Sequence, residues 1–406
     1  MSKQLLIAGG GIGGMAAALA AARAGWQVQV LERACAFSEV GAGIQLGPNV
    51  TRVLHAWGLQ DALGQVAAFP AALLARDAFD GRQLGSLPLG ERVQKRYGAP
   101  YATLHRADMH QLLETAVQTH ARVQIHMGVQ LQELREPANA VQAVSDGQTW
   151  QADAFVGADG LWGQARQSLL GDGGPRVSGH LAWRAMLDQS RLPPAARSQC
   201  VTVWMGPRMH AVQYPVRGGQ WLNLVVITEG TPPEQPRGWD HQANTYELMA
   251  RVGRVCAPLR ELLEAASQAS VNRCVWRLWP LCDRPPVPSA AHMARGRMAL
   301  LGDAAHPMRP YLAQGAGMAV EDADMLGRCL QQADAATVPR QLQRYAQARW
   351  ARCAKVQARS QRNGAIFHAS GFMRAARNAV MHALGARIMD VPWLYSYQGD
   401  KACHAH

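Results

Sequence analysis

The feature of this sequence that most constrains its fold is a glycine-rich turn between two apolar segments near the N-terminus. Residues 5–8 are apolar and favour a strand, and residues 15–24 favour a helix that ends at Gly25. Residues 26–31 favour a second strand, which ends at Glu32. The turn between the first strand and the helix contains Gly9, Gly11, Gly13 and Gly14. Strand, glycines, helix, strand and acid in this order predict a β-α-β unit that binds a dinucleotide.

Each part of this unit has a physical role in nucleotide binding. Gly9 allows the tight turn, Gly11 lets a pyrophosphate approach the backbone, and Gly14 lets the helix pack closely on the strand. The helix N-terminus then faces the phosphates, and Glu32 can accept hydrogen bonds from a ribose. The other interpretation, an alanine-rich helix behind a glycine turn, leaves the second strand and its terminal acid unexplained.

The composition narrows the class of protein. The 406 residues are enough for two or three domains, and a hydrophobic fraction of 48% fits a globular protein with a core. No run of about 18 apolar residues and no signal peptide occur, so we expect a cytoplasmic protein without stable membrane association. The eight cysteines are scattered, without C-x-x-C or zinc spacing, so we expect reduced thiols and no metal site.

The net charge of +12 comes mostly from arginine. These charges are dispersed, without a basic run or interleaved aromatic residues, so we do not expect nucleic acid as a partner. Anionic small molecules, such as a dinucleotide or an aromatic carboxylate, fit an arginine-rich surface better.

The rest of the chain predicts two interleaved domains rather than two consecutive ones. Residues 70–100 lose periodicity and read as an excursion from the first sheet, whereas residues 106–117 favour a helix that returns to it. Residues 181–227 alternate as strands do and predict a second, β-rich domain. Residues 316–386 are mostly helical in pattern, and Asn49 is expected to cap a helix.

Three further motifs follow the first one along the chain. They are Gly157-Ala158-Asp159-Gly160, Gly302-Asp303-Ala304-Ala305-His306-Pro307 and Gln314-Gly315-Ala316-Gly317. Together with the N-terminal fingerprint, they resemble the single-component FAD-dependent aromatic hydroxylases, also called group A flavoprotein monooxygenases.

Local signatures place the chain near one branch of that group. These are Gly41-Ala42-Gly43-Ile44-Gln45-Leu46, Pro48-Asn49, His105-Arg106-Ala107-Asp108, Trp204-x-Gly206-Pro207 with His210 and Tyr214, and Trp393-Leu394-Tyr395. They resemble the branch of salicylate hydroxylase, 3-hydroxybenzoate 6-hydroxylase and 6-hydroxynicotinate 3-monooxygenase.

The resemblance implies an α/β fold like that of p-hydroxybenzoate hydroxylase. In this fold a Rossmann-like FAD-binding domain is interleaved with a β-sheet substrate domain, and helices follow at the C-terminus. On this basis we expect the FAD-binding domain in residues 1–72, 99–176 and 275–360. The substrate domain would take residues 73–98 and 177–274, and residues 361–406 would form a C-terminal helical segment.

The resemblance also implies how FAD is held. Asp303 would bind the flavin ribitol, and the helix starting near Gly315 and Ala316 would direct its N-terminal amides at the flavin ring. Arg106 would reach the FAD phosphates. Asp159, with Arg166, would serve both FAD and the nicotinamide donor, although Gly163 stands where the pattern usually has serine. Arg33 either helps to hold that donor or is surface charge.

The chemistry implied by the family is hydroxylation of a phenolic aromatic acid. NADH or NADPH reduces FAD, which reacts with O2 to a flavin C4a-hydroperoxide, and one oxygen atom is transferred to the ring. The phenol must be deprotonated, so a base is needed in the β-rich domain. His210 and Tyr214 lie on one strand face, and a histidine with a pKa near its ordinary value can be that base at neutral pH.

The substrate end of the site leaves several choices open. Arg184 and Arg309 are both candidates for the substrate carboxylate, and Arg309 could instead face solvent. Gln45 and Pro310 are further substrate-binding candidates, and Arg309-Pro310 resembles the Lys-Pro of the pyridine-acid hydroxylases. The acid itself, decarboxylative or simple hydroxylation, and a monomeric or homodimeric state all stay open.

Two other functions are compatible with the FAD motifs. One is a ubiquinone-pathway aromatic ring hydroxylase, which works at a membrane with partners. The apparent lack of an amphipathic basic and apolar helix argues against it. The other is a non-enzymatic flavoprotein that acts as a redox sensor. Substrate-stimulated NAD(P)H consumption separates this last class from the hydroxylases.

Overall fold

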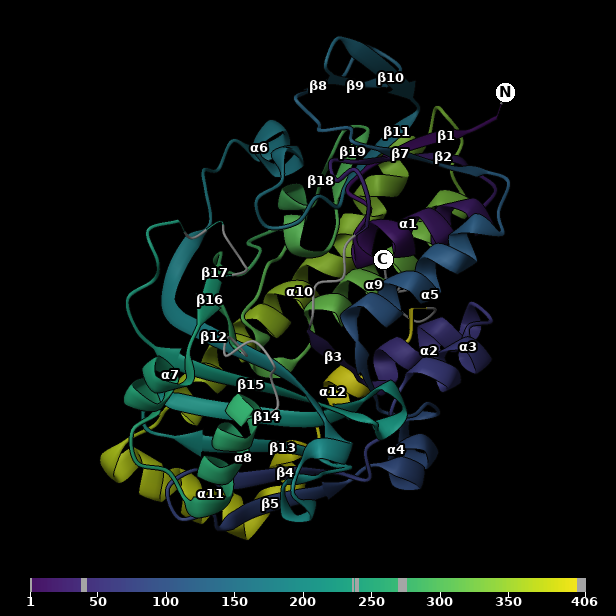
Figure 1. Ribbon diagram of the computed structural model, residues 1–406. Coiled ribbons are helices and arrows are strands. Elements are labelled where there is room, and N and C mark those ends of the chain that lie inside the picture. The colour runs from purple at the N-terminus through teal and green to yellow at the C-terminus, as the bar shows by residue number, and fades with distance from the viewer. Residues whose placement is uncertain (1, 38–41, 236, 238–240, 269–275, 400–406) are drawn as a thin grey trace.

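The computed structural model describes the whole chain except residues 1, 38–41, 236, 238–240, 269–275 and 400–406 (Figure 1). Gly41 of the predicted loop motif therefore lies outside the described residues. Two large sheets organise the rest, one of six strands in the order β18-β19-β11-β1-β2-β7 and one of eight in the order β16-β17-β12-β15-β14-β13-β4-β5. In Figure 1 the six-stranded sheet lies at the top and the eight-stranded sheet below it.

The strands have the following bounds. The six-stranded sheet contains β1 (Gln4–Ala8), β2 (Gln27–Glu32), β7 (Val123–Met127), β11 (Ala154–Gly157), β18 (Ala294–Arg295) and β19 (Met298–Leu300). The eight-stranded sheet contains β4 (Ala72–Asp77), β5 (Gln83–Pro88), β12 (Arg176–Asp188), β13 (Val201–Gly206), β14 (Met209–Val216), β15 (Trp221–Glu229), β16 (His241–Ala243) and β17 (Trp276–Asp283). Two small sheets contain β3 (Gly43–Leu46) with β6 (Ala102–His105), and β8 (Glu133–Arg135), β9 (Val141–Ser145) and β10 (Gln148–Ala152).

The helices are α1 (Ile12–Arg23), α2 (Pro48–Ala56), α3 (Gln60–Val66), α4 (Gly90–Tyr97), α5 (Arg106–Gln118), α6 (Gln164–Leu170), α7 (Thr245–Val252), α8 (Ala257–Gln268), α9 (Gly315–Gln331), α10 (Val338–Phe367), α11 (Gly371–Met389) and α12 (Pro392–Tyr395). The β-α-β unit predicted at the N-terminus is present as β1-α1-β2. The excursion predicted at residues 70–100 supplies β4 and β5 to the eight-stranded sheet.

The N-terminal turn needs its glycines for steric reasons. Gly9 has a φ of 98°, which favours glycine. A Cβ atom on Gly14 would lie 1.8 Å from the carbonyl oxygen of Gly9, so any other residue would push α1 away from β1. The alanines along α1 are buried, which lets the helix pack tightly between the sheet and α9.

The nucleotide motifs lie at one edge of the six-stranded sheet because their strands are parallel. β1 pairs in parallel with β2 and β11, and β11 pairs in parallel with β19. The strand ends at Ala8, Leu31, Gly157 and Leu300 therefore lie side by side. The N-terminal glycines, Gly157-Ala158-Asp159-Gly160 and the Gly302-Asp303 turn each follow one of these ends, where ligands bind in open α/β sheets, whereas the motif at Gln314 starts α9.

The two faces of the eight-stranded sheet have different partners. The outer face buries Trp183, Leu222 and Leu224 against Leu259 and Leu263 of α8. Successive residues of a strand point to opposite faces, so the residues between the outward-facing ones point to the inner face. The inner-face residues include Ala182, Val225, Ile227 and Trp279, which cluster with Ala42 and Tyr311. His210 and Tyr214 share this inner face, because they alternate with the outward-facing Ala211 on β14.

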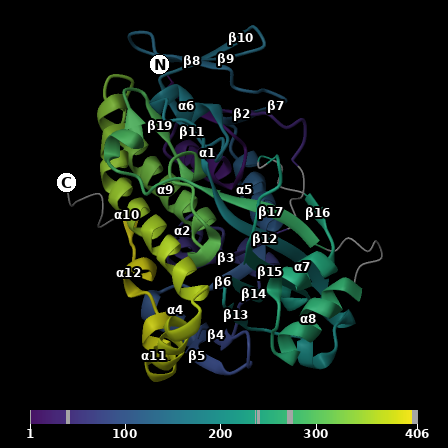
Figure 2. The ribbon, with the colours of Figure 1, turned by 90° about the vertical axis from the view of Figure 1, so that its left-hand side faces the viewer.

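The helices α10 and α11 connect and cover the sheets. α10 contacts β18 and β19 at one end and the segment Pro310–Leu312 further along, and Figure 2 shows it running down one side of the molecule. It continues without a break across residue 360, where the sequence predicted a boundary. Among the described helices, none is long and apolar enough to cross a membrane.

One local expectation is wrong. Asn49 does not cap a helix: it lies inside α2, whose N-cap is Gly47, and its side-chain amide donates to Glu321 and Gln314. These partners are distant in the sequence, so a short window could not reveal them. The helix α11 exposes the apolar residues Phe372, Met373, Val380 and Leu384, and its arginines Arg374 and Arg377 pair with Asp77 of β4.

Candidate active site

The N-terminus of α1 offers room for a phosphate. A Cβ atom on Gly11 would meet no atom within 4 Å, and no side chain caps the helix. Gly13, two residues further along the chain, has no such space, because a Cβ atom there would contact Leu301 and Ala319. Glu32 is fixed beside the turn, because its carboxylate accepts hydrogen bonds from the amides of Gly10 (2.6 Å) and Ala34 (2.8 Å). The open space and the free first-turn amides fit the pyrophosphate of a dinucleotide.

The position of Asp159 explains why Gly163 stands where the family pattern usually has serine. Asp159 accepts a hydrogen bond from the amide of Ala165 (2.8 Å), and a Cβ atom on Gly163 would lie 2.0 Å from its carboxyl carbon. Gly163 therefore makes room for the inward position of Asp159. Burial raises the pKa of Asp159 to about 6, against the lowering effect of the Ala165 amide and of Arg33.

Arg166 is occupied by protein groups. It forms an ion pair with Asp172 and donates hydrogen bonds to the carbonyls of Ala304 (3.1 Å) and Ala305 (2.6 Å). Its side chain therefore fastens the turn that carries Asp303, which is a positioning role rather than a direct contact with a nicotinamide donor.

Asp303, Arg106 and the start of α9 converge. Asp303 keeps an exposed surface although protein groups surround it, and a Cβ atom on Gly315 would lie 3.9 Å from its Oδ1 atom, with Ala316 next along α9. Burial among neighbouring groups raises the pKa of Asp303, whereas His306 and Arg106 lower it. Burial lowers the pKa of Arg106, whose charge acts on Asp303 and also on Arg184 of the other sheet. Arg106 thus lies between the nucleotide edge and the inner face.

On the inner face, His210 is buried against a second histidine. Its Nδ1 atom lies 2.8 Å from Nε2 of His368, in hydrogen-bonding contact. Burial, together with the neighbouring His368 and His180, lowers the pKa of His210 well below the ordinary value. The expectation that its pKa lies near the ordinary value is therefore wrong, and His210 is neutral at pH 7.

Tyr214 lies two positions along the same strand face, beyond Val212, and packs against strand β3. A Cβ atom on Gly43 would lie 2.6 Å from the Tyr214 ring, and the Gly43 amide donates to Asn223 (2.8 Å). Burial raises the pKa of Tyr214, although Arg184, Gln45 and Asn223 act to lower it. Tyr214 therefore keeps its proton at neutral pH and can act as a hydrogen-bond donor. Gln45 itself accepts a hydrogen bond from the Tyr101 hydroxyl (2.7 Å).

The two candidate arginines differ in their partners. The guanidinium of Arg184 lies 3.7 Å from the centre of the Trp279 ring, and its buried Nε atom has no hydrogen-bond partner. Burial lowers the pKa of Arg184 to about 10. Arg309, in contrast, donates from Nε to the buried carboxylate of Asp283 (2.7 Å), so it neither faces solvent nor is unpaired. Pro310 starts a short 3-10 helix, Pro310–Leu312, that presents Tyr311.

Three residues of this face were not predicted from the sequence. The Tyr311 hydroxyl contacts Nδ1 of His180 (2.7 Å), and the His180 ring stacks on His368 with centres 5.1 Å apart. Strand alternation could have found His180, because it shares a face with Arg184. No local pattern marks Tyr311 or His368 as facing His210: Tyr311 lies in the 3-10 helix Pro310–Leu312 and His368 is the C-cap of α10.

A buried charge network lies behind the nucleotide edge. His306, Asp322 and Cys353 come within 4.8 Å of one another, a spacing that a metal could use. Asp322, however, is already paired with both His306 (2.5 Å) and Arg349 (2.7 Å). Although burial would lower the pKa of His306, Cys353 and Asp322 raise it well above the ordinary value, which favours the protonated ring that pairs with Asp322. The arrangement is that of a structural ion-pair network.

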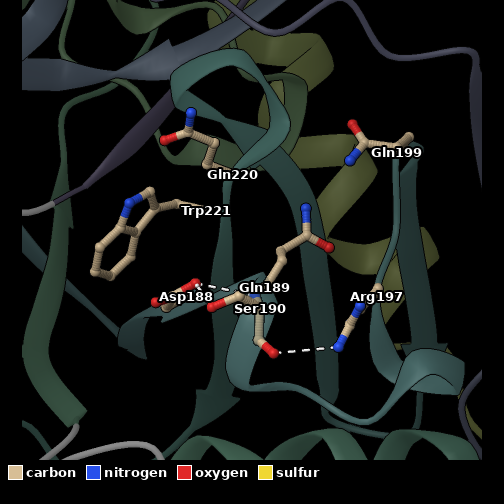
Figure 3. Close-up of a pocket in the computed structure, with 7 residues that line it drawn as sticks. All are labelled: Asp188, Gln189, Ser190, Arg197, Gln199, Gln220 and Trp221. Carbon is tan, nitrogen blue, oxygen red and sulfur yellow. Dashed lines mark hydrogen bonds between the residues drawn. The ribbon is translucent and has the colours of Figure 1, made fainter.

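A polar pocket of about 390 Å³ lies elsewhere, where β12 ends and β15 begins (Figure 3). Asp188, Gln189, Ser190, Arg197, Gln199, Gln220 and Trp221 line it. Ser190 donates to Asp188, and Arg197 donates to the Ser190 carbonyl. Its polar groups bond to one another, and it contains none of the candidate residues.

A nucleotide-binding sheet edge that faces a buried sheet with a histidine and a tyrosine defines a nucleotide-dependent oxidoreductase with a two-part site. The model of the FAD binding domain family matches residues 2–360. The 3-hydroxybenzoate 6-hydroxylase 1 of Aquipseudomonas alcaligenes is 37% identical over 403 residues, which cover 97% of this chain and 98% of that protein. The 6-hydroxynicotinate 3-monooxygenase of Bordetella bronchiseptica is 35% identical over 339 residues, 81% of this chain and 83% of that protein.

A solved structure, a salicylate hydroxylase in complex with its substrate, has the same fold. Its TM-score is 0.82 at 24% identity, with 99% of this chain and 97% of that chain covered. The chain therefore belongs to the FAD binding domain family, and it is an FAD-dependent monooxygenase. The α/β fold and the family expected from the motifs are confirmed. NADH or NADPH as electron donor is typical of these hydroxylases, and neither alternative function fits such relatives.

Proposed function

We propose that this protein hydroxylates a small phenolic aromatic acid, of the hydroxybenzoate or hydroxynicotinate type, with FAD, O2 and NADH or NADPH. The observation that carries the proposal is the inner sheet face, where a buried neutral histidine and a buried protonated tyrosine lie near Arg184, whose Nε atom has no hydrogen-bond partner among the described residues. This set matches the groups of a phenolic acid: a proton to remove, a ring to orient and a carboxylate to pair.

Residue roles follow from this arrangement. His210 takes the phenol proton, Tyr214 and Gln45 orient the ring, and Arg184 pairs with the carboxylate. Arg184 is the better carboxylate partner because Arg309 is neutralised by Asp283. Arg309 and Pro310 would then shape the site by placing Tyr311.

The residues of the nucleotide edge fit FAD. Gly9, Gly11, Gly14 and Glu32 would hold its adenosine and pyrophosphate part, with Arg106, Asp159, Asp303, Gly315 and Ala316 along the rest. Bound FAD would supply the reduction and activation of O2, and the protein would supply binding, orientation and proton transfer.

We further propose the domain division expected from the sequence, with one adjustment. The last segment of the FAD-binding domain extends to Phe367, so that the helix α10 is not divided. We also propose that the enzyme acts in the cytoplasm as a monomer or homodimer.

The test is a panel of hydroxybenzoates and hydroxynicotinates, scored for stimulated NAD(P)H oxidation with product identification. We expect one acid to give a stoichiometric hydroxylated product, and retention or loss of the carboxyl group decides between simple and decarboxylative hydroxylation. Matching phenols without a carboxyl group serve as controls. Equal stimulation by acids and phenols, or no flavin absorbance after reconstitution with FAD, would contradict the proposal.

A further inference from the structure

A line of polar side chains leads from the buried His210 to the surface. His210 Nδ1 contacts His368 Nε2 at 2.8 Å, and His368 Nδ1 lies 3.4 Å from Oε1 of Glu229. His210 and His368 are buried, whereas the side chain of Glu229 is 34% exposed. The three residues come from β14, from the end of α10 and from the end of β15. His368 also lies beyond the residues that the family model matches.

The backbone holds these side chains in place. The amide of Arg208 donates to the carbonyl of His368 (3.1 Å), and the amide of Glu229 donates to the carbonyl of Arg208 (3.1 Å). The exposed side chain of Arg208 donates to the other carboxylate oxygen of Glu229 (2.9 Å). Glu229 therefore presents Oε1 to His368 while Oε2 is occupied.

The ionised carboxylate dictates the proton positions on both rings. Nδ1 of His368 has no hydrogen-bond partner of good geometry, but it lies 3.4 Å from the ionised Oε1 of Glu229, so the charge of the carboxylate favours a proton on Nδ1. The Nε2 atom of His368 is then an acceptor, so His210 must carry its proton on Nδ1. This leaves Nε2 of His210 unprotonated and able to accept a proton.

We propose that His368 and Glu229 fix His210 in the tautomer that can accept the phenol proton, and that they carry that proton onward to solvent. This inference rests on the function proposed above. Both are positioning residues, because neither contacts the substrate. In this arrangement His368 orients the base, His210, and the carboxylate of Glu229 in turn orients His368.

The proton transfer balances along the line. Nε2 of His210 accepts the phenol proton and Nδ1 releases its own to Nε2 of His368. His368 in turn releases its Nδ1 proton to Glu229, which exchanges it with water. The phenol becomes a phenolate, and no net charge is left on the buried rings.

The surroundings favour such a shared transfer over a protonated His210. The groups that face the two rings are His180 from β12, Tyr311 from the 3-10 helix, Phe367, the cation of Arg309 and the carboxylate of Glu229. Burial and His180 lower the pKa of His368 to about 4, although Glu229 acts to raise it. Burial would raise the pKa of Glu229, but the hydrogen bond from Arg208 and the contact with His368 lower it, so Glu229 is ionised at neutral pH.

The test uses two variants of the FAD-loaded enzyme, His368→Phe and Glu229→Gln. Glu229 and its partner Arg208 are both partly exposed, so Glu229→Gln should keep the fold while it removes the charge that faces His368. Glu91→Gln, an exposed carboxylate paired with Lys95 on α4, is the matched control. Nitrogen-15 NMR of histidine-labelled protein, with His210 assigned through His210→Ala, reports which ring nitrogen carries the proton. Stopped-flow absorbance with 3-hydroxybenzoate as probe reports phenolate formation across pH.

We expect the proton of His210 on Nδ1 in the wild type and in Glu91→Gln, and on Nε2 in a detectable share of both test variants. Phenolate formation should slow about 100-fold in His368→Phe, at the low end of general-base effects, and about 10-fold in Glu229→Gln, below that range because the base and its histidine partner remain; the KM of the probe should change little. Wild-type tautomer and rate in both variants would overturn the relay. If His210→Ala itself keeps the wild-type rate, the proposed base is wrong instead, so the two failures are distinguishable.

Discussion

The nucleotide edge and the inner sheet face are built in different ways. At the edge, each function depends on backbone conformation next to a strand end, as at Gly9 and Gly14, where a side chain would not fit. At the inner face, the working groups are side chains from distant segments, such as His180, His210 and His368. The first region is specified by short motifs, whereas the second exists only after the chain has folded. Mutations should therefore act on the two regions differently.

The largest effect is expected from closing the glycine turn. Gly14→Ala places a Cβ atom 1.8 Å from the Gly9 carbonyl, which costs about 3 kcal/mol or more and separates α1 from β1. The variant should retain no FAD after gel filtration and should melt earlier. Gly64→Ala in α3, where a Cβ meets nothing within 4 Å, should be neutral or slightly stabilising. Gly11→Ala should fold normally but bind FAD more weakly, and wild-type affinity there would show that no phosphate lies over Gly11.

The second effect isolates the chemistry of the inner face. His210→Ala should lower the hydroxylation rate by about 10²–10⁴, because the phenol loses its base. FAD binding should be unchanged, since His210 touches none of the nucleotide motifs. Hydroxylated product and hydrogen peroxide per NAD(P)H are the measurements. A normal product yield would move the base to the substrate or to another residue.

The third effect separates the two arginines. Arg184→Met should raise the KM for an aromatic acid at least 10-fold more than the KM for the matching phenol. The substrate carboxylate would lose the one of the two arginines that Asp283 does not neutralise. Arg309→Met should instead lower the unfolding free energy by about 1–3 kcal/mol, between the values for exposed and buried pairs, since Asp283 loses its partner. Steady-state kinetics and urea unfolding compare them. The reverse pattern would make Arg309 the substrate ligand.

The smallest effect concerns pH and the nucleotide edge. Burial raises the pKa of Asp159 to about 6, so the folded state holds this proton more tightly than the unfolded chain does. The stabilisation is full below pH 4 and is lost as the pH rises through about 6. In the apoprotein, Asp159→Asn should remove this loss, so the stability of wild type relative to the variant should fall between pH 4 and pH 7. The measurement is the free energy of urea unfolding of both proteins as a function of pH. If the two curves are parallel, Asp159 titrates normally.

The sequence could predict the nucleotide edge because its signals are local. The tight turn and the close helix contact lie within six residues, Gly9 to Gly14, and the acid at the strand end, Glu32, follows within the same β-α-β unit, so one continuous segment carries all three signals. Strand alternation also placed His210 and Tyr214 on one face. The pKa of His210 could not be predicted, because it depends on His180 and His368, which are distant in the sequence. Asn49 was misassigned for the same reason, since its partner Glu321 lies on α9.

The long helix α10 makes the two regions mechanically dependent. Its 30 residues rise about 45 Å in total. One end packs on the strands that lead to Asp303, and the other end delivers His368 to His210. A tilt of about 5° around the middle of such a rod moves each end by about 2 Å, which is enough to break the contact of 2.8 Å between the histidines. A rigid tilt of this helix would therefore carry a shift at the nucleotide edge to the contact between His210 and His368, even if the side chains between them kept their conformations.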